Sequence, residues 1–195
     1  GLANVKYLLD TPGRRLEHAG LEMHFEDDAL TVYKNRHFRP RVQFYERQSF
    51  VRIGDFFDWR NRNQVFGPVI NALRRPDFDI GSSLLLTERP GPSSGPPLGP
   101  SQRTAPHVEV TSYENNHTVI AVDTPRAGFV LLADNAYPGW TASLNGVDVP
   151  ILRAWLTFRA VAVPAGRSTI EFAYNPARLK LSVAASAGLV IAWLF

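Results

Sequence analysis

Apolar and polar positions alternate in the first part of the chain with the two-residue period of a β-strand. Leu21, Met23 and Phe25 fall on one side of this period, and glutamate and histidine residues separate them. The dipeptide Asp27-Asp28 supplies a turn before the next apolar segment at residues 30–33. We therefore expect an antiparallel hairpin in this part of the chain.

The segments that follow combine strand and helix patterns. Residues 41–45 and 49–53 are short and rich in β-branched and aromatic side chains, which predicts two more strands. Between residues 55 and 75 the apolar positions approach helical spacing, so one or two short helices are expected there. The pair Arg75-Pro76 ends this stretch, because proline disfavours helical geometry in the residue before it. Together these elements predict a smaller α+β N-terminal part over residues 1–87.

A segment rich in proline, glycine and serine follows. Residues 88–106 contain almost no apolar side chain that a core could bury, which predicts an exposed loop. Beyond it, over residues 107–177, short strands alternate with turn signals at the spacing of a sandwich or barrel. Residues 129–132 are apolar on both faces and are expected in the middle of a sheet. The predicted fold class is therefore mainly β, with an antiparallel β-sandwich or jelly-roll-like C-terminal part.

Four turn signals organise this C-terminal part. Residues 114–116 separate two strand patterns and predict a hairpin turn. Pro138 and Gly139 suit the two central positions of a type II turn, because proline fixes a negative φ and glycine accepts a positive one. The pair Asn145-Gly146 predicts a type I′ hairpin. Residues 164–166, with sequence Pro-Ala-Gly, are expected to close another hairpin.

The end of the chain is strongly apolar. Residues 181–195 contain no charged side chain. A helix that spans a membrane needs about 20 apolar residues, so this run is long enough to begin one. We expect residues 178–195 to form the start of a transmembrane helix that holds the chain in the lipid bilayer. The alternative is a buried C-terminal helix of a soluble domain.

Composition and charge argue against several classes of function. The 195 residues carry a formal net charge of +3, from 21 Lys and Arg against 18 Asp and Glu, spread along the sequence. Nucleic-acid binding needs a concentrated basic stripe, so no nucleic-acid partner is expected. The chain has no cysteine, which excludes disulfides and thiolate chemistry. Its five histidines lack metal-ligand spacing, and no nucleophile elbow or phosphate-binding glycine loop is found. We therefore expect no metal, no cofactor and no catalytic residue here.

Aromatic and polar residues at turn tips are better candidates for function. A sugar can place its apolar face on an aromatic ring while its hydroxyl groups bond to Asp, Asn or Arg. Two turns of this chain offer that combination. The candidate glycan-binding residues are Asp134, Asn135, Tyr137 and Trp140 at one turn, and Trp59 and Arg60 at the other. The alternative is that Trp140 and Trp155 are core residues of the sandwich, because large aromatic side chains are mostly buried.

Several separated blocks, found in order, resemble one known family. Residues 134–146 contain Tyr-Pro-Gly-Trp and Asn-Gly, residues 159–166 end in Pro-Ala-Gly, and residues 172–176 read Phe-Ala-Tyr-Asn-Pro. These blocks resemble the C-terminal region of YfhO-type bacterial membrane proteins. Residues 4–8 and 32–41 are similar to the opening of the same region, so the resemblance brackets nearly the whole chain.

The resemblance implies a polytopic protein of the bacterial cell membrane that is similar to glycosyltransferases using polyprenyl-linked sugars in cell-envelope glycosylation. In such proteins the catalytic carboxylate lies in an early extracytoplasmic loop near the N-terminus, so no catalytic residue is carried over to this chain. The expected role is that of a non-catalytic extracytoplasmic domain that positions a glycan acceptor or shapes access to a membrane-embedded active site. The expected partner besides the bilayer is a glycan or a lipid-linked sugar. The alternatives are a carbohydrate-binding β-sandwich module and a structural spacer that braces membrane helices.

Overall fold

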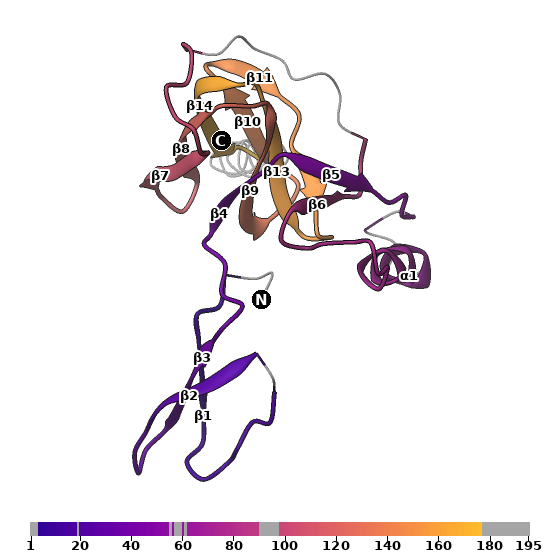
Figure 1. The fold of residues 1–195 in the computed structure, drawn as a ribbon. Helices are drawn as coiled ribbons and strands as arrows, with labels where there is room; N and C mark the ends of the chain where they lie inside the picture. The colour runs from indigo at the N-terminus through magenta and orange to yellow at the C-terminus, as the bar shows by residue number, and fades with distance from the viewer. Residues whose placement is uncertain are drawn as a thin grey trace, which may run out of the picture.

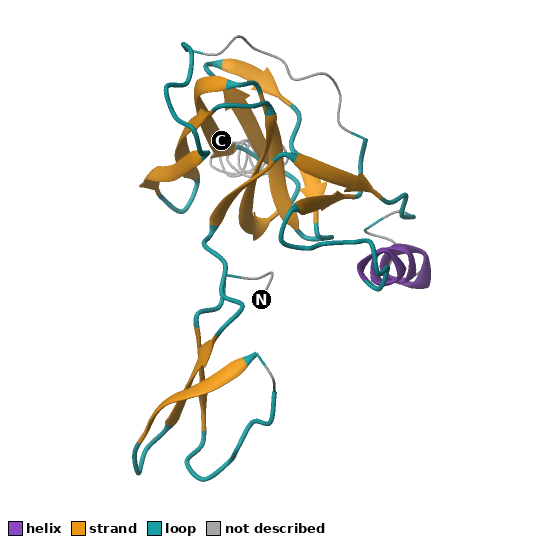
Figure 2. Ribbon diagram, in the orientation of Figure 1, coloured by secondary structure: helices purple, strands orange, loops and turns teal. Residues whose placement is uncertain are grey.

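The computed structural model describes residues 4–18, 20–54, 56, 60, 62–89 and 98–176. Within these residues the chain is mainly β, with three sheets and a short helix (Figures 1 and 2). The prediction of a mainly β, antiparallel fold is confirmed. The expected transmembrane helix over residues 178–195 lies outside the described residues. No helix among the described residues is long and apolar enough to cross a membrane.

The N-terminal strands form a small antiparallel sheet that extends away from the other two (Figure 1). Its strands are β1 (Tyr7–Asp10), β2 (Leu21–Glu26) and β3 (Thr31–Asn35), in the order β1-β3-β2. The pairing of β2 with β3 confirms the predicted hairpin.

The predicted common face of this hairpin is wrong. The register shifts between Met23 and Phe25, so that Met23 lies opposite Tyr33 and Phe25 opposite the adjacent Val32. Since neighbouring residues of a strand point to opposite faces, the bulge places Met23 and Phe25 on different sides of the sheet. Both side chains are about half exposed, at 50% and 51%.

A five-stranded antiparallel sheet forms one layer of the main body. It contains β7 (His107–Tyr113), β8 (His117–Thr124), β10 (Trp140–Leu144), β11 (Val147–Val149) and β14 (Gly166–Tyr174), in the order β11-β10-β14-β8-β7. Asn145 and Gly146 have φ angles of 54° and 80° in the β10–β11 turn, which confirms the type I′ signal. The hairpin between β7 and β8 is confirmed as well.

A six-stranded sheet forms the second layer, and it takes strands from both sides of the 88–106 segment. The strands are β4 (Val42–Tyr45), β5 (Arg47–Phe50), β6 (Ser83–Leu86), β9 (Gly128–Asn135), β12 (Leu152–Ala154) and β13 (Phe158–Val163), in the order β4-β9-β13-β12-β6-β5. As predicted from its apolar run, β9 lies inside a sheet, between β4 and β13. The pair β5–β6 is parallel, and the helix α1 (Arg62–Leu73) lies in the connection between them.

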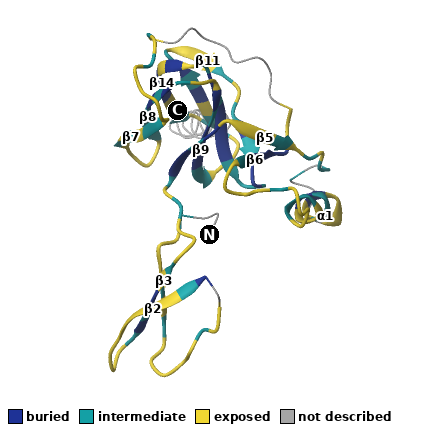
Figure 3. Cartoon of the chain, viewed as in Figure 1, coloured by how far each residue is buried: buried dark blue, intermediate teal, exposed yellow. Residues whose placement is uncertain are grey.

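The interior has two apolar clusters, one on each face of the six-stranded sheet. Figure 3 shows buried residues concentrated in the strands of the two larger sheets. The first lies between the two sheets and includes Ile120, Val130, Leu144 and Phe172, all fully buried. The second joins β6 and β12 to Val69 of α1. Since the central strands are covered on both faces, they are apolar throughout, as the sequence of β6 (Ser-Leu-Leu-Leu) illustrates.

The hairpin predicted at residues 164–166 is not formed. β13 lies between β9 and β12 in one sheet, whereas β14 pairs with β8 and β10 in the other. The Pro-Ala-Gly turn therefore carries the chain from one layer to the next. A turn signal specifies a reversal of direction, but the choice of partner strand depends on which sheet edges are still free.

Candidate functional site

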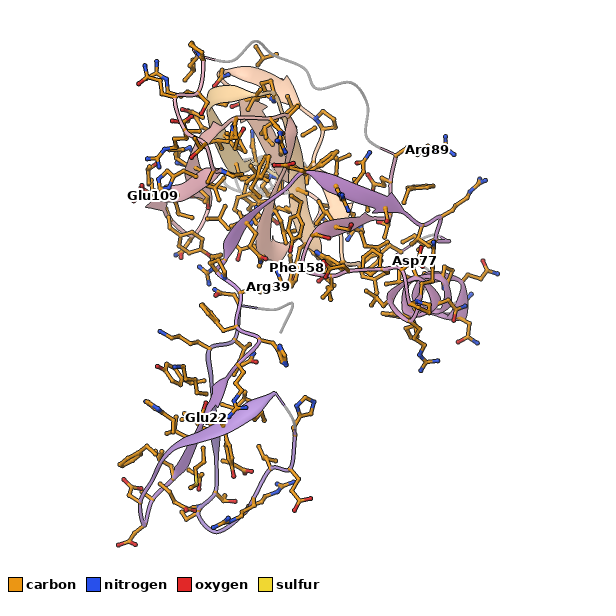
Figure 4. All side chains as sticks on the ribbon, in the orientation of Figure 1. Glu22, Arg39, Asp77, Arg89, Glu109 and Phe158 are labelled. Atoms are coloured by element: carbon orange, nitrogen blue, oxygen red, sulfur yellow. The ribbon has the colours of Figure 1, made fainter. Side chains whose placement is uncertain are left out.

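The turn that leads from β9 to β10 connects the two sheets at one end of the sandwich. Phe158, which Figure 4 labels at this end, pairs with Asn135 across β13 and β9. The Ala136 N–H donates to the carbonyl of Thr157 at 2.5 Å, and the Asn175 N–H donates to the carbonyl of Gly139 at 2.7 Å. The turn is therefore tied to the β12–β13 turn on one side and to the end of β14 on the other.

The local backbone agrees with the predicted type II turn. Gly139 has a φ of 103°, and the Trp140 N–H lies 3.5 Å from the Tyr137 carbonyl oxygen. A Cβ added at Gly139 would lie 2.9 Å from Cε2 of Tyr174 and 3.1 Å from Cβ of Pro176. Glycine is required here both by the positive φ and by the close approach of β14.

This requirement gives a prediction with a matched control inside the same protein. Gly146→Ala introduces a side chain at a φ of 80° with no heavy atom within 4 Å, so it carries mainly the left-handed backbone cost of about 1 kcal/mol. Gly139→Ala adds the steric conflict with Tyr174, and we expect a further loss of about 1–3 kcal/mol. Urea unfolding of both variants measures the difference, and equal losses would contradict the packing described here.

Asp134 holds together side chains from both sheets. One carboxylate oxygen, Oδ2, accepts from Arg159 Nη2 at 3.2 Å and from the Tyr113 hydroxyl at 3.1 Å. The other, Oδ1, lies 3.6 Å from Nε of Arg41, whose guanidinium also covers the Tyr113 ring at 4.5 Å. Burial and the neighbouring Asp134 carboxylate raise the pKa of Tyr113, which therefore remains a hydroxyl donor.

Arg159 is a buried cation enclosed by aromatic rings. Its side chain is 2% exposed, and its guanidinium carbon lies 3.8 Å from the centroid of the Trp140 ring and 5.1 Å from that of Phe172. Its Nε and Nη1 atoms are buried without a hydrogen-bond partner. Burial lowers the pKa of the guanidinium, while Asp134 opposes that shift. Arg159 and Asp134 therefore form a largely desolvated ion pair directly against the indole of Trp140.

A small pocket opens beside the turn. Its volume is about 140 Å³. Aromatic, aliphatic and charged side chains meet around it. It is lined by Glu88, Ala136, Tyr137, Pro138, Trp140, Ile151 and Arg153. Tyr137 is 64% exposed and stands at the rim, whereas Trp140 is half-buried and packs against the inter-sheet core.

The two charged lining residues are of opposite sign. Arg153 Nη1 donates to the carbonyl of Leu156 at 3.3 Å, and its guanidinium stacks on Phe56 at 4.1 Å. Burial lowers the pKa of Arg153, and the nearby carboxylate of Glu88 opposes this shift. The pocket lining thus combines a guanidinium and a carboxylate with apolar side chains.

A strained turn supports this end of the sandwich. Trp155 and Leu156 connect β12 to β13 with φ angles of 49° and 72°, which residues other than glycine seldom adopt. Trp155 is buried and packs edge-on against Phe78, 5.8 Å between ring centroids, which confirms it as a core residue. The carbonyls of Leu156 and Thr157 accept from Arg153 and Ala136 respectively, so the strained turn orients one pocket residue and the backbone of another.

The structure brings together part of the predicted glycan-binding set. Tyr137 and Trp140 line the pocket, while Asn135 is exposed at the end of β9. The carboxylate of Asp134 is engaged inside the protein by Arg159, Tyr113 and Arg41.

The structure describes one of the two residues predicted at the second turn. Arg60 is exposed and lies shortly before α1, while Trp59 is outside the described residues. The prediction also missed Arg153, Glu88 and Arg159. A signal for Arg159 was present, since it is the only charged residue in the otherwise apolar strand Phe-Arg-Ala-Val-Ala-Val.

No metal cluster accompanies this site. In the part of the chain that the structure describes, no three histidine or acidic side chains gather closely enough to hold an ion. Asp77 pairs with Arg75, with Oδ2 and Nη2 2.6 Å apart, and Asp79 accepts from the Gly81 N–H at 2.7 Å.

Comparison with known proteins finds a match for one part of the chain, and that part contains most of the site. Residues 101–186 match the family model described as bacterial membrane protein YfhO. No curated protein and no solved structure matches the chain. The matched residues include β7 to β14, and with them Asp134, Arg159 and most of the pocket lining. This segment, residues 101–186, is therefore similar to the YfhO family of bacterial membrane proteins.

Proposed function

We propose that this chain is a non-catalytic extracytoplasmic domain of a polytopic YfhO-type membrane protein, and that the pocket beside Trp140 holds one sugar unit of a glycan acceptor. In this proposal the intact membrane protein resembles glycosyltransferases that use polyprenyl-linked sugars in cell-envelope glycosylation.

The observation that carries the proposal is the convergence of rings and opposite charges in one small pocket. Tyr137 and Trp140 offer faces for the apolar side of a sugar, and Arg153 and Glu88 offer donors and acceptors for its hydroxyl groups. The volume of about 140 Å³ is well below the roughly 300–1,000 Å³ of pockets for drug-sized ligands. A single ring at the end or in the side chain of a glycan is therefore the ligand that suits it.

One observation favours a second candidate, the structural spacer. Asp134, which the sequence offers as a sugar ligand, is instead bonded to Arg159 and Tyr113 in a network that joins both sheets. A spacer needs such rigidity and no ligand. A free-standing carbohydrate-binding module is the remaining alternative, and it differs in being independent of membrane spans.

The test is a titration of the isotopically labelled chain with glucose, galactose, N-acetylglucosamine and soluble fragments of envelope glycans. We expect NMR shifts confined to the pocket. Shifts confined to another part of the chain would show that this pocket is not the binding site, and the absence of shifts with all of these probes would favour the spacer. Hydropathy of the complete open reading frame separates the membrane domain from the free-standing module, because many flanking apolar spans are expected only for the former.

Tyr137 provides a direct prediction. Tyr137→Ala removes an exposed ring from the rim of the pocket, so we expect about a tenfold loss of glycan affinity with little change in stability. Tyr7→Ala is the matched control, because Tyr7 is also exposed but lies in the separate N-terminal sheet. Equal affinities of the two variants would remove Tyr137 from the binding site.

A further inference from the structure

A groove runs along the edge of β4, away from the sugar pocket. Its volume is about 530 Å³. β4 ends the six-stranded sheet, with β9 on its inner side. The groove follows the outer side, and side chains from both faces of β4 reach it, Val42 and Phe44 from the inter-sheet face and Gln43 and Tyr45 from the other.

The backbone of this edge has hydrogen-bonding groups directed into the groove. The Ala133 N–H donates to the carbonyl of Arg41 at 2.8 Å, which fixes the phase of the antiparallel ladder between β4 and β9. Since bonding alternates along an antiparallel strand, Gln43 and Tyr45 bond to β9. The N–H and C=O groups of Val42 and Phe44 therefore point to the open side.

The other edges of the five- and six-stranded sheets carry features that discourage pairing with a further strand. β5 has the exposed Arg47, β7 has a bulge between Val110 and Ser112, and β11 has three residues. The residues of β4 are Val-Gln-Phe-Tyr, with no charge, proline or bulge. Its edge is thus the one most suited to accept another strand among the edges of these two sheets.

The groove is lined from more than one part of the chain. Pro106, His107 and Val108, at and just before the start of β7, line it together with Gly81. A strand added in the groove would bond to the backbone of β4 and place alternate side chains against the partly buried Phe44 and Val108.

The charges of the groove indicate what the peptide carries. Arg39 and His107 line it, and none of its lining residues is acidic. The Nε2 atom of His107 lies 3.5 Å from Oε2 of Glu109, so Arg39 is the cation that lines the groove. Figure 4 labels Arg39 at the point where the chain enters β4 from the N-terminal sheet. The nearby Asp79 carboxylate accepts from the N–H of Gly81 and the hydroxyl of Ser82, and the charges of Arg39 and Arg47 also help to lower its pKa. An acidic side chain at one end of the peptide would therefore complement the Arg39 end.

We propose that the edge of β4 is a docking site for an extended segment of another polypeptide, with apolar side chains at alternate positions and an acidic residue at one end. The segment adds a strand to the six-stranded sheet beside β4. This site is separate from the sugar pocket and does not depend on its function.

The experiment uses the full chain and two blocked peptides in which valine and threonine alternate, with an aspartate at the N-terminal end of one and at the C-terminal end of the other. Hydrogen exchange followed by NMR is measured with and without each peptide. We expect at least one peptide to slow exchange of the Val42 and Phe44 amides about tenfold or more, with no change at Gln43, whose amide already bonds to β9.

The controls act on the peptide and on one arginine. Methylation of the peptide nitrogens that face β4 is expected to abolish the protection, whereas methylation of the outward nitrogens leaves it intact. Arg39→Gln is expected to weaken binding several-fold, and Arg36→Gln, outside the groove, to leave it unchanged. Absence of protection with both peptides overturns the proposal. The proposal is also overturned if exchange of the Val42 and Phe44 amides slows as the protein concentration is raised without any peptide. A second copy of the chain would then be the occupant.

Discussion

Asp134→Asn is expected to destabilise the protein by about 3 kcal/mol, although its side chain is not part of the apolar core. Arg159 is 2% exposed, and Asp134 is the carboxylate bonded to it. Removal of that charge leaves a buried guanidinium uncompensated, which typically costs roughly 3–5 kcal/mol. Nε and Nη1 of Arg159 are already buried without hydrogen-bond partners, so no other nearby group replaces the interaction with Asp134. Urea unfolding measures the change.

The opposite substitution is expected to cost much less. Arg159→Met replaces the buried cation with an apolar side chain of similar length, between the rings of Trp140 and Phe172. Asp134 keeps the Tyr113 hydroxyl and Arg41, and its side chain has some access to water. A loss of about 1 kcal/mol or less follows, and the double variant is expected to recover most of the stability lost by Asp134→Asn. A larger loss for Arg159→Met than for Asp134→Asn would show that the network is organised differently.

This network explains why the sequence predicted the turn better than the site. Pro138 and Gly139 have strong local preferences, so the geometry of the turn could be predicted without knowledge of its surroundings. The engagement of Asp134 could not, because Arg159 lies 25 positions along the chain and Tyr113 lies in the other sheet. A polar residue at a turn tip is a sugar ligand or an internal partner depending on contacts that only the fold creates.

The same limit applies to the architecture. Residues 42–45 and 83–86 were predicted to belong to an α+β N-terminal part, and the structure places β4 and β6 in one sheet with β9, β12 and β13. Local propensity and period identify a strand, whereas sheet membership depends on partners far along the chain. The predicted hairpin at residues 164–166 was wrong for the same reason, since both edges of β13 are already paired.

Trp140 has two roles that a pair of variants can separate. It packs against the inter-sheet core and covers Arg159, and it also lines the pocket. Trp140→Ala removes both, and we expect a loss of about 2–4 kcal/mol in stability together with loss of glycan binding. A change in binding by this variant alone would therefore not distinguish a ligand contact from a disturbed fold.

Trp140→Phe resolves the ambiguity, because phenylalanine keeps a ring over Arg159 but has a smaller face and no indole N–H. Stability is expected to fall by about 1 kcal/mol, whereas glycan affinity falls several-fold if the indole contacts the sugar. Denaturant unfolding and the NMR titration measure the two quantities on the same sample. If affinity is retained in both variants wherever the protein remains folded, Trp140 serves only the ion pair beneath it, and the spacer becomes the better account of this domain.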